Sequence, residues 1–304
     1  MSKKVKLFTH TDLDGVGCAI VCRSFFGVDN VNVDYCDYNE INTKVTNFLN
    51  EGTDEYDAIF ITDISVAEEV AEKINDTAAD KIMLIDHHAT ALWLNKYDWA
   101  TVIVKGIKGK ESGTSLFNEW LQVHMSNIRT NPMLSEFAEL VRRYDTWEWK
   151  TRYGVLKPKK MNDLLYIIGR ERFVARPHEF EYFTTNFSAN EELLLELEAE
   201  KESAYIEKKK SEVRRLVVEG FTVGIVFADR YLSSLGEEIA KVNEDIDIVA
   251  MVNPPKAVSF RTVKSDIHLG EFAQKFGGGG HAKAAGCSLN VNSVNSLGLA
   301  AYLW

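Results

Sequence analysis

Three side chains that commonly bind metals follow one another at Asp86-His87-His88. They come directly after the apolar run 81–85, which has the length and composition of a buried strand. A carboxylate and two imidazoles at the end of a strand can hold a divalent metal ion, and such an ion can activate water for hydrolysis. The tripeptide therefore predicts a catalytic metal centre.

Two further apolar strands end on side chains of the same kinds. One precedes His10, Asp12 and Asp14, and the strand predicted at 58–61 leads to Asp63. In an open α/β sheet, ligands bind beyond the carboxyl ends of the parallel strands, so we expect all of these groups at one edge. If the segment from His10 to Asp14 stays extended, its spacing of two places the three side chains on one face. One strand end could then serve two metals.

The types of ligand indicate both the metal and the reaction. Carboxylates and imidazoles without thiolates favour hard or borderline ions, with Mn²⁺ as the first choice and Mg²⁺ as the alternative. Two such ions about 3.5–4 Å apart clamp the attacking and leaving oxygens of a phosphoryl displacement and lower the pKa of a water between them. The sequence thus predicts two divalent ions and hydrolysis of a phosphoester.

In order and spacing, these residues together with Asp145 resemble the four motifs of the DHH phosphoesterase superfamily. The run from Phe276 to Gly286 resembles the glycine-rich signature of the C-terminal domain that accompanies DHH domains in nucleic-acid and nucleotide phosphodiesterases. Residues 9–17 place two aspartates two and four positions after His10, a form most similar to the NrnB-like oligoribonuclease branch. Many other members have them four and six positions after the histidine, and RecJ-like exonucleases begin this motif with an aspartate.

The resemblance implies a role for each of these residues. His88 faces the substrate and assists the leaving group or its phosphate. Asp86 orients a metal ligand without binding the metal itself, or has a purely structural role. For Asp145, the alternative to binding a metal is capping a turn at the end of a helix. The implied ligands are His10, Asp12 and Asp63 for the first metal, and Asp14, the bridging Asp63, His87 and Asp145 for the second.

The glycine run 277–280 has a physical use of its own. Residues without Cβ allow backbone N–H groups to approach a phosphate closely, although such a run by itself is also typical of a flexible loop. For Arg261, the alternative to a phosphate contact is an ordinary exposed arginine on a strand. The substrate-binding residues that the resemblance implies are Arg261, Gly278, Gly279, Gly280 and His281.

The length of 304 residues exceeds the usual size of a single core, and 45% hydrophobic residues suit globular folding. Strand and helix patterns alternate over 1–188, which predicts an α/β domain with a doubly wound, mainly parallel sheet. A charged stretch predicts a helical linker at 189–216. Residues 217–304 are expected to form a smaller α/β substrate-binding domain, with the substrate in the cleft between the domains. Within the first domain we expect helices at 15–26, 41–49, 113–121 and 133–144 and a strand at 32–38.

Charge and cysteine usage narrow the possible partners and location. The net charge of −10 disfavours extended binding to long nucleic acids and suits short substrates. No signal peptide or apolar stretch of 18 residues is present, so we expect a cytoplasmic protein without a membrane partner. The four cysteines lack the spacing of a metal site and are expected in the core: Cys18, Cys22, Cys36 and Cys287.

These features together predict a manganese-dependent phosphodiesterase that hydrolyses short RNA oligonucleotides (nanoRNA) by a two-metal mechanism, with attack from the 3′ end implied by the resemblance. Linear or cyclic dinucleotides and 3′-phosphoadenosine 5′-phosphate are alternative substrates, because family members share the metal motifs across them. A non-catalytic nucleotide-binding sensor is the alternative of another class, but such a protein is expected to lack ligands, and every position is filled here. The oligomeric state stays open, with a homodimer as one option.

Overall fold

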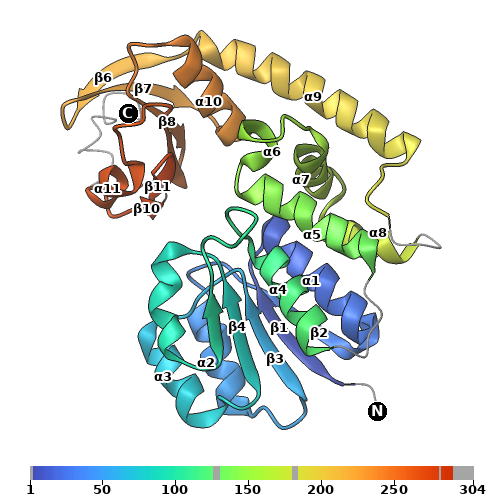
Figure 1. The fold of residues 1–304 in the computed structure, drawn as a ribbon. Coiled ribbons are helices and arrows are strands. Elements are labelled where there is room, and N and C mark those ends of the chain that lie inside the picture. Colours follow the sequence, from blue (N-terminus) through green and yellow to red (C-terminus); the bar gives the residue numbers. More distant parts are fainter. Residues whose placement is uncertain (1–2, 126–130, 180–183, 281, 290–304) are drawn as a thin grey trace. The chain divides into compact units, whose positions relative to one another are not determined.

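The computed structural model describes residues 3–125, 131–179, 184–280 and 282–289. The chain divides into two compact units, Met1–Leu195 and Glu196–Trp304. Each unit is built around its own sheet (Figure 1). Within the described residues, no helix is long and apolar enough to cross a membrane.

The sheet of the first unit has five strands: β1 (Val5–Thr9), β2 (Val31–Tyr35), β3 (Ala58–Thr62), β4 (Ile82–Asp86) and β5 (Ala100–Val102). They are hydrogen-bonded in the order β2-β1-β3-β4-β5, and every neighbouring pair is parallel. This arrangement confirms the predicted doubly wound parallel sheet. The strand order reverses between β1 and β3, which is where ligands bind in folds of this kind.

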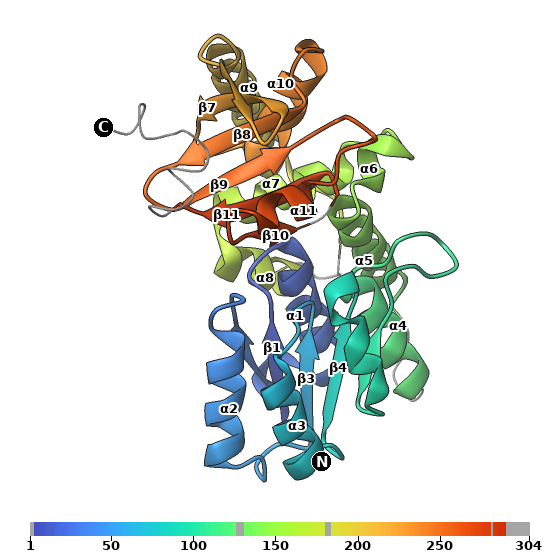
Figure 2. The same ribbon diagram turned by 90° about the vertical axis from the view of Figure 1, so that its left-hand side faces the viewer.

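Helices cover both faces of this sheet (Figures 1 and 2). Strand β3 shows how the two faces are separated, since Ile59 and Ile61 pack with α2 and α3, while Phe60 packs with α1, α4 and α5. The bounds of these helices are α1 Leu13–Phe26, α2 Ile41–Glu51, α3 Glu68–Thr77, α4 Gly113–His124 and α5 Pro132–Asp145. Shorter elements complete the unit: η1 Val28–Asn30, η2 Ala89–Lys96, α6 Glu148–Thr151, α7 Lys157–Ile168 and α8 Arg170–Glu179.

The predicted helices agree with the structure to within a few residues, but the strand predicted at 32–38 is too long. Strand β2 ends at Tyr35 and is followed by a turn, in which the Glu40 N–H donates to the Asp37 carbonyl oxygen at 2.9 Å. Cys36, directly after the strand, is fully buried and donates its N–H to the Thr9 carbonyl oxygen at 2.8 Å, so that buried residues continue past the end of β2. The four cysteines are all buried and unpaired, which confirms their predicted place in the core.

Helix α9 (Ala189–Lys210) spans the boundary between the two units and leads into the sheet of the second unit. Its sheet is mixed, with α10 (Leu232–Val242) packed on one face and α11 (Leu269–Gln274) on the other. Residues 214–216, which we assigned to the linker, belong to strand β6. The strands, in the order β10-β11-β9-β8-β7-β6, have the bounds β6 Arg214–Val218, β7 Phe221–Phe227, β8 Ile248–Asn253, β9 Ala257–Arg261, β10 Gly279–Gly280 and β11 Ala284–Ser288.

Candidate metal centre

The segment after strand β1 does not stay extended as our spacing argument assumed. Helix α1 begins almost at once, and Asp12 becomes its N-cap, with Oδ1 accepting the N–H groups of Asp14 and Gly15, both at 3.1 Å. The unpaired N–H groups of the first helical turn bind this carboxylate and turn the chain. Asp12 and Asp14 therefore point into different clusters, so that one strand end still contributes to two groups of ligands.

A first cluster gathers His10, Asp12 and Asp63. Nδ1 of His10 lies 3.1 Å from Oδ2 of Asp12 and 3.9 Å from Oδ2 of Asp63. One ligand atom from each of the three residues lies within 4.8 Å of the others. The structure thus brings together the three residues that the family resemblance implied for one ion.

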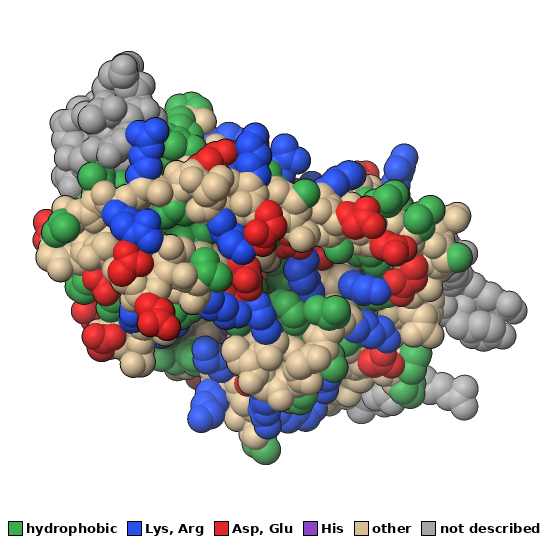
Figure 3. Space-filling view, turned by 90° about the horizontal axis from the view of Figure 1, so that it is seen from above, with side chains coloured by type: hydrophobic (Ala, Val, Ile, Leu, Met, Phe, Trp, Pro, Cys, Tyr) green, Lys and Arg blue, Asp and Glu red, His purple; other side chains and the backbone are tan. Residues whose placement is uncertain are grey.

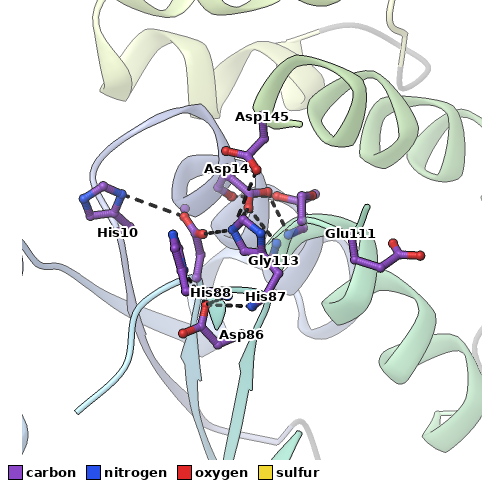
Figure 4. A network of polar contacts seen from close by, with 12 residues as sticks. His10, Asp14, Asp86, His87, His88, Glu111, Gly113 and Asp145 are labelled. Atoms are coloured by element: carbon purple, nitrogen blue, oxygen red, sulfur yellow. Dashed lines mark hydrogen bonds and ion pairs between the residues drawn. The ribbon is translucent and has the colours of Figure 1, made fainter. Parts of the chain in front are cut away.

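A second cluster forms around His87. Its Nε2 lies 3.1 Å from Oδ1 of Asp63, 3.5 Å from Oδ2 of Asp14 and 3.7 Å from Oδ2 of Asp145. In Figure 4, Asp14 from α1 and Asp145 from the end of α5 point toward His87. Because Oδ1 of Asp63 faces this cluster and Oδ2 faces the first, Asp63 stands between the two.

The backbone at Asp63 is held in an uncommon conformation. Its φ angle is +58°, in the left-handed region that side chains other than glycine adopt only with strain. The Asp63 N–H donates to the carbonyl oxygen of Ile85 at 3.1 Å, which ties the end of β3 to the end of β4. This turn aims the carboxylate away from the sheet and between the clusters.

The first turn of helix α4 holds the carboxylate of Asp14 by hydrogen bonds. The N–H of Gly113 donates to Oδ2 of Asp14 at 2.6 Å, the N–H of Thr114 donates to Oδ1 at 2.9 Å, and the Thr114 hydroxyl donates to the Asp14 carbonyl oxygen at 2.6 Å. The N-cap of α4 is Ser112, which together with Ser115 forms a capping box. Sequence reasoning found this helix but missed the contact, although unpaired N–H groups at a helix start are a general signal for a carboxylate partner.

Three observations indicate that the side chains of the two clusters fit divalent metal ions. Five carboxylates surround the histidines, and Oδ2 of Asp63 is buried without a hydrogen-bond partner. Burial, and then the charges of Asp14 and Asp12, raise the pKa of Asp63 well above its usual range, and the same causes raise that of Asp145. Bound cations would supply the positive charge that such crowded carboxylates lack.

Comparison with known proteins identifies the family. The N-terminal domain of the DHH family matches residues 4–142, and the DHHA1 domain matches residues 227–299. Oligoribonuclease NrnB of Bacillus subtilis (strain 168) is 41% identical over 295 residues, which cover 93% of this chain and 72% of that protein. The chain belongs to the DHH family. The predicted resemblance is therefore confirmed.

Solved structures share this DHH fold along the whole chain. A pGpG-specific phosphodiesterase, PggH of Vibrio cholerae, has a TM-score of 0.55 at 14% identity, covering 98% of this chain and 97% of that one. RecJ of Thermus thermophilus in complex with Mn²⁺ has a TM-score of 0.55 at 11% identity, covering all of this chain but 53% of RecJ. At these identities the likeness concerns the fold alone.

Within this DHH centre, Asp86 contacts the two histidines that follow it. It is fully buried, and its Oδ1 accepts the His87 N–H at 2.7 Å and lies 2.7 Å from Nδ1 of His88. Burial alone would lower the pKa of His88, but the hydrogen bond and charge of Asp86 raise it to about 9. For Asp86 the directions are reversed, since burial alone would raise its pKa, but the hydrogen bond to His88 holds that pKa below its usual range. The two side chains therefore form an ion pair at neutral pH.

This ion pair predicts a pH dependence of folding stability in the metal-free protein. The folded-state pKa of His88, about 9, exceeds the usual value of 6.5, so the stabilisation is fully present below about pH 6.5 and is lost as the pH rises through about 9. The difference in free energy of unfolding between wild type and His88→Gln should shrink by on the order of 2 kcal/mol between pH 6 and pH 9.5. Denaturant unfolding in EDTA measures it. A difference that stays constant or grows with pH would contradict the ion pair.

The substrate residues predicted in the DHHA1 domain have structural partners of their own. Arg261, at the end of β9, donates from its guanidinium to the Ser233 hydroxyl at 2.9 Å and to the Phe260 carbonyl oxygen at 2.8 Å. Gly236 of α10 gives it room, since a Cβ there would lie 2.6 Å from Cγ of Arg261. The guanidinium is thus held in place rather than free in solvent.

Two of the four glycines in the run 277–280 belong to a strand. Gly279 and Gly280 form β10, which pairs with β11. A Cβ on Gly278 would lie 2.0 Å from the carbonyl oxygen of Gly286, and Gly280 has a φ of +138°. Close packing against β11 is therefore a sufficient reason for glycine at these two positions, and Gly279 has open space around it. His281 lies outside the described residues.

Proposed function

We propose that this protein is a metal-dependent phosphodiesterase that hydrolyses short RNA oligonucleotides. The observation that carries the proposal is the position of Asp63 between two clusters of metal-binding side chains, in a DHH-family chain 41% identical to a protein named oligoribonuclease NrnB. The sensor alternative has less support, because each proposed ligand position holds a residue able to bind a metal.

The proposed centre takes two divalent ions, with Mn²⁺ preferred and Mg²⁺ as the alternative. Oxygen and imidazole donors suit both, and RecJ structures hold either metal. When bound, such ions neutralise charge on the phosphate and lower the pKa of the attacking water. The proposed ligands are His10, Asp12 and Asp63 in the first cluster, and Asp14, Asp63, His87 and Asp145 in the second.

The chain's own side chains supply the remaining steps. Nδ1 of His88 lies 2.7 Å from Oδ1 of the buried Asp86, and the hydrogen bond and charge of Asp86 favour the protonated form of His88. Nε2–H is then the group that donates a hydrogen bond to a substrate oxygen and passes a proton to the departing one. The N–H groups at the start of α4 hold the Asp14 carboxylate at a fixed angle while the reaction proceeds.

The second unit completes the proposed enzyme. Residues 1–188 form the proposed catalytic domain, the linker begins at residue 189 and ends before β6, and the substrate-binding domain includes β6 from Arg214 onward. In that domain, Arg261 and the glycines Gly278, Gly279 and Gly280 contact substrate phosphate. On the face seen in Figure 3, basic and acidic side chains are interspersed. The net charge of the chain, −10, suits short substrates better than long nucleic acids.

A ladder of 5′-labelled RNA, from two to twenty-four nucleotides, tests the substrate and the direction of attack. In Mn²⁺ we expect the shortest members to be consumed fastest, with stepwise loss from the 3′ end, and Asp63→Ala protein to be inactive. Hydrolysis confined to dinucleotides would support the dinucleotide alternative. Inactivity on every length, together with tight binding of a nucleotide, would support the sensor.

Arg261 is expected to act on substrate affinity and not on metal binding. Arg261→Gln should raise KM for a short RNA about tenfold, because a charge-assisted contact to phosphate is lost, and should leave the Mn²⁺ affinity unchanged. Arg215→Gln is the matched control, since Arg215 lies on β6 in the same sheet and pairs with Asp245 at 2.6 Å. Equal KM values for the two variants would refute the proposed contact.

A further inference from the structure

Tyr38 lies in the turn between β2 and α2, and this turn is anchored to the loop that carries His10. The Cys36 N–H donates to the Thr9 carbonyl oxygen at 2.8 Å, and the Thr11 hydroxyl donates to Oδ1 of Asp37 at 3.1 Å. Hydrogen bonds on both sides of the loop therefore fix the backbone that presents Tyr38.

The ring of Tyr38 lies beside two histidines of the centre, His10 and His88, and Figure 4 shows where these two histidines lie. Its centroid is 5.1 Å from that of His10, with the planes tilted by 46°, and 6.4 Å from that of His88, edge to face. The Tyr38 residue nevertheless remains 58% exposed. One aromatic side chain thus reaches from the first metal cluster to the proposed proton donor and keeps much of its surface open.

Neither core packing nor hydrogen bonding accounts for this position. The exposed ring buries little apolar surface, and the hydroxyl oxygen lies 3.5 Å from Nε2 of His88, at the limit for a hydrogen bond. Aromatic side chains beside a phosphate-binding site commonly stack on nucleobases, whichever base is present. Tyrosine suits this use because only two side-chain torsions must be ordered.

We propose that Tyr38 is a nucleobase platform, on which the base of the nucleotide at the metal centre stacks. The inference rests on the proposed function, since it needs a nucleotide phosphate at the clusters around Asp63. It adds a specificity residue: the ring would favour substrates with an unpaired base next to the reacting phosphate over phosphate esters without one.

Binding of two small probes tests this platform apart from catalysis. Adenosine 5′-monophosphate and ribose 5-phosphate carry the same phosphate and sugar, and only the first has a base. By calorimetry in Mn²⁺, wild type should bind the monophosphate about tenfold more tightly than the sugar phosphate. Tyr38→Ala should abolish this difference by weakening the monophosphate alone, while Tyr38→Phe should keep it, because the ring remains.

Two results would overturn the inference. One is equal weakening of both probes by Tyr38→Ala, which would indicate a general effect on the centre. The other is a monophosphate affinity that Tyr38→Ala leaves unchanged. Hydrolysis of a 5′-phosphorylated diadenylate by wild type separates the two claims: if it proceeds while the platform test fails, only the platform is wrong, and if the diadenylate and longer RNA are both left intact, the proposed function itself fails.

Discussion

Replacing Asp63 with asparagine should lower kcat/KM for a short RNA about a thousandfold. Oδ2 of Asp63 faces His10 and Oδ1 faces His87, so the change removes one charge from both clusters and turns one oxygen into an amide nitrogen that cannot bind a metal. Metal-dependent stabilisation of a phosphoryl transition state is worth several kcal/mol, and each 1.36 kcal/mol is a factor of ten in rate. Steady-state hydrolysis of a diadenylate in Mn²⁺ measures the loss.

Asp54→Asn is the matched control for this variant. The substitution is the same, but the Asp54 side chain is fully exposed, at 106% of its reference area. Its Oδ1 lies 3.7 Å from Nζ of Lys81. This control should keep wild-type activity. Retention of more than a tenth of the activity by Asp63→Asn would show that the bridging position is not essential.

Gly113→Ala should lower kcat/KM at least a hundredfold and weaken Mn²⁺ binding. A methyl group on Gly113 would lie 2.6 Å from Cβ and 3.0 Å from Cα of Asp63, closer than real Cβ contacts allow. Either the Asp63 turn or the start of α4 must move, and the latter also carries the N–H groups that hold Asp14. A misplacement of about 1 Å in such a site can lower the rate about a hundredfold.

Ser115→Ala perturbs the same helix terminus without intruding on Asp63. It removes half of the capping box, so we expect a loss of about 1 kcal/mol in the free energy of unfolding and an unchanged Mn²⁺ affinity. Calorimetric Mn²⁺ titrations of both variants, paired with thermal unfolding, distinguish a metal-site effect from a general loss of stability. If Gly113→Ala binds Mn²⁺ as wild type does, the close contact has no consequence for the centre.

Much of this fold and of the candidate centre could be predicted because the informative residues lie next to strong strand signals. The apolar runs before His10, Asp63 and Asp86 identify three strands, and parallel pairing brings their carboxyl ends to one edge. Convergence of the side chains therefore followed from sheet geometry, without knowledge of any long-range contact.

Contacts made through helix ends and turns were harder to predict. We expected His10, Asp12 and Asp14 on one face of an extended segment, but Asp12 caps α1 instead. The spacing of these residues alone does not reveal the cap. The N–H of Gly113 meets Asp14 across 99 positions of sequence, and only the packing of α4 against α1 brings them together. Tyr38 was predicted to lie in a strand, and its place beside His10 and His88 depends on where the hydrogen bonds of β2 end.

The count of Mn²⁺ ions bound per chain tests most directly whether the two clusters form one centre that shares Asp63. Native mass spectrometry and calorimetry on the full chain should find two ions in wild type, and one ion in each of His10→Ala and Asp145→Ala, which affect different clusters. Asp63→Asn should weaken both sites together. A single ion in wild type, or two ions with wild-type affinity in Asp63→Asn, would contradict the account.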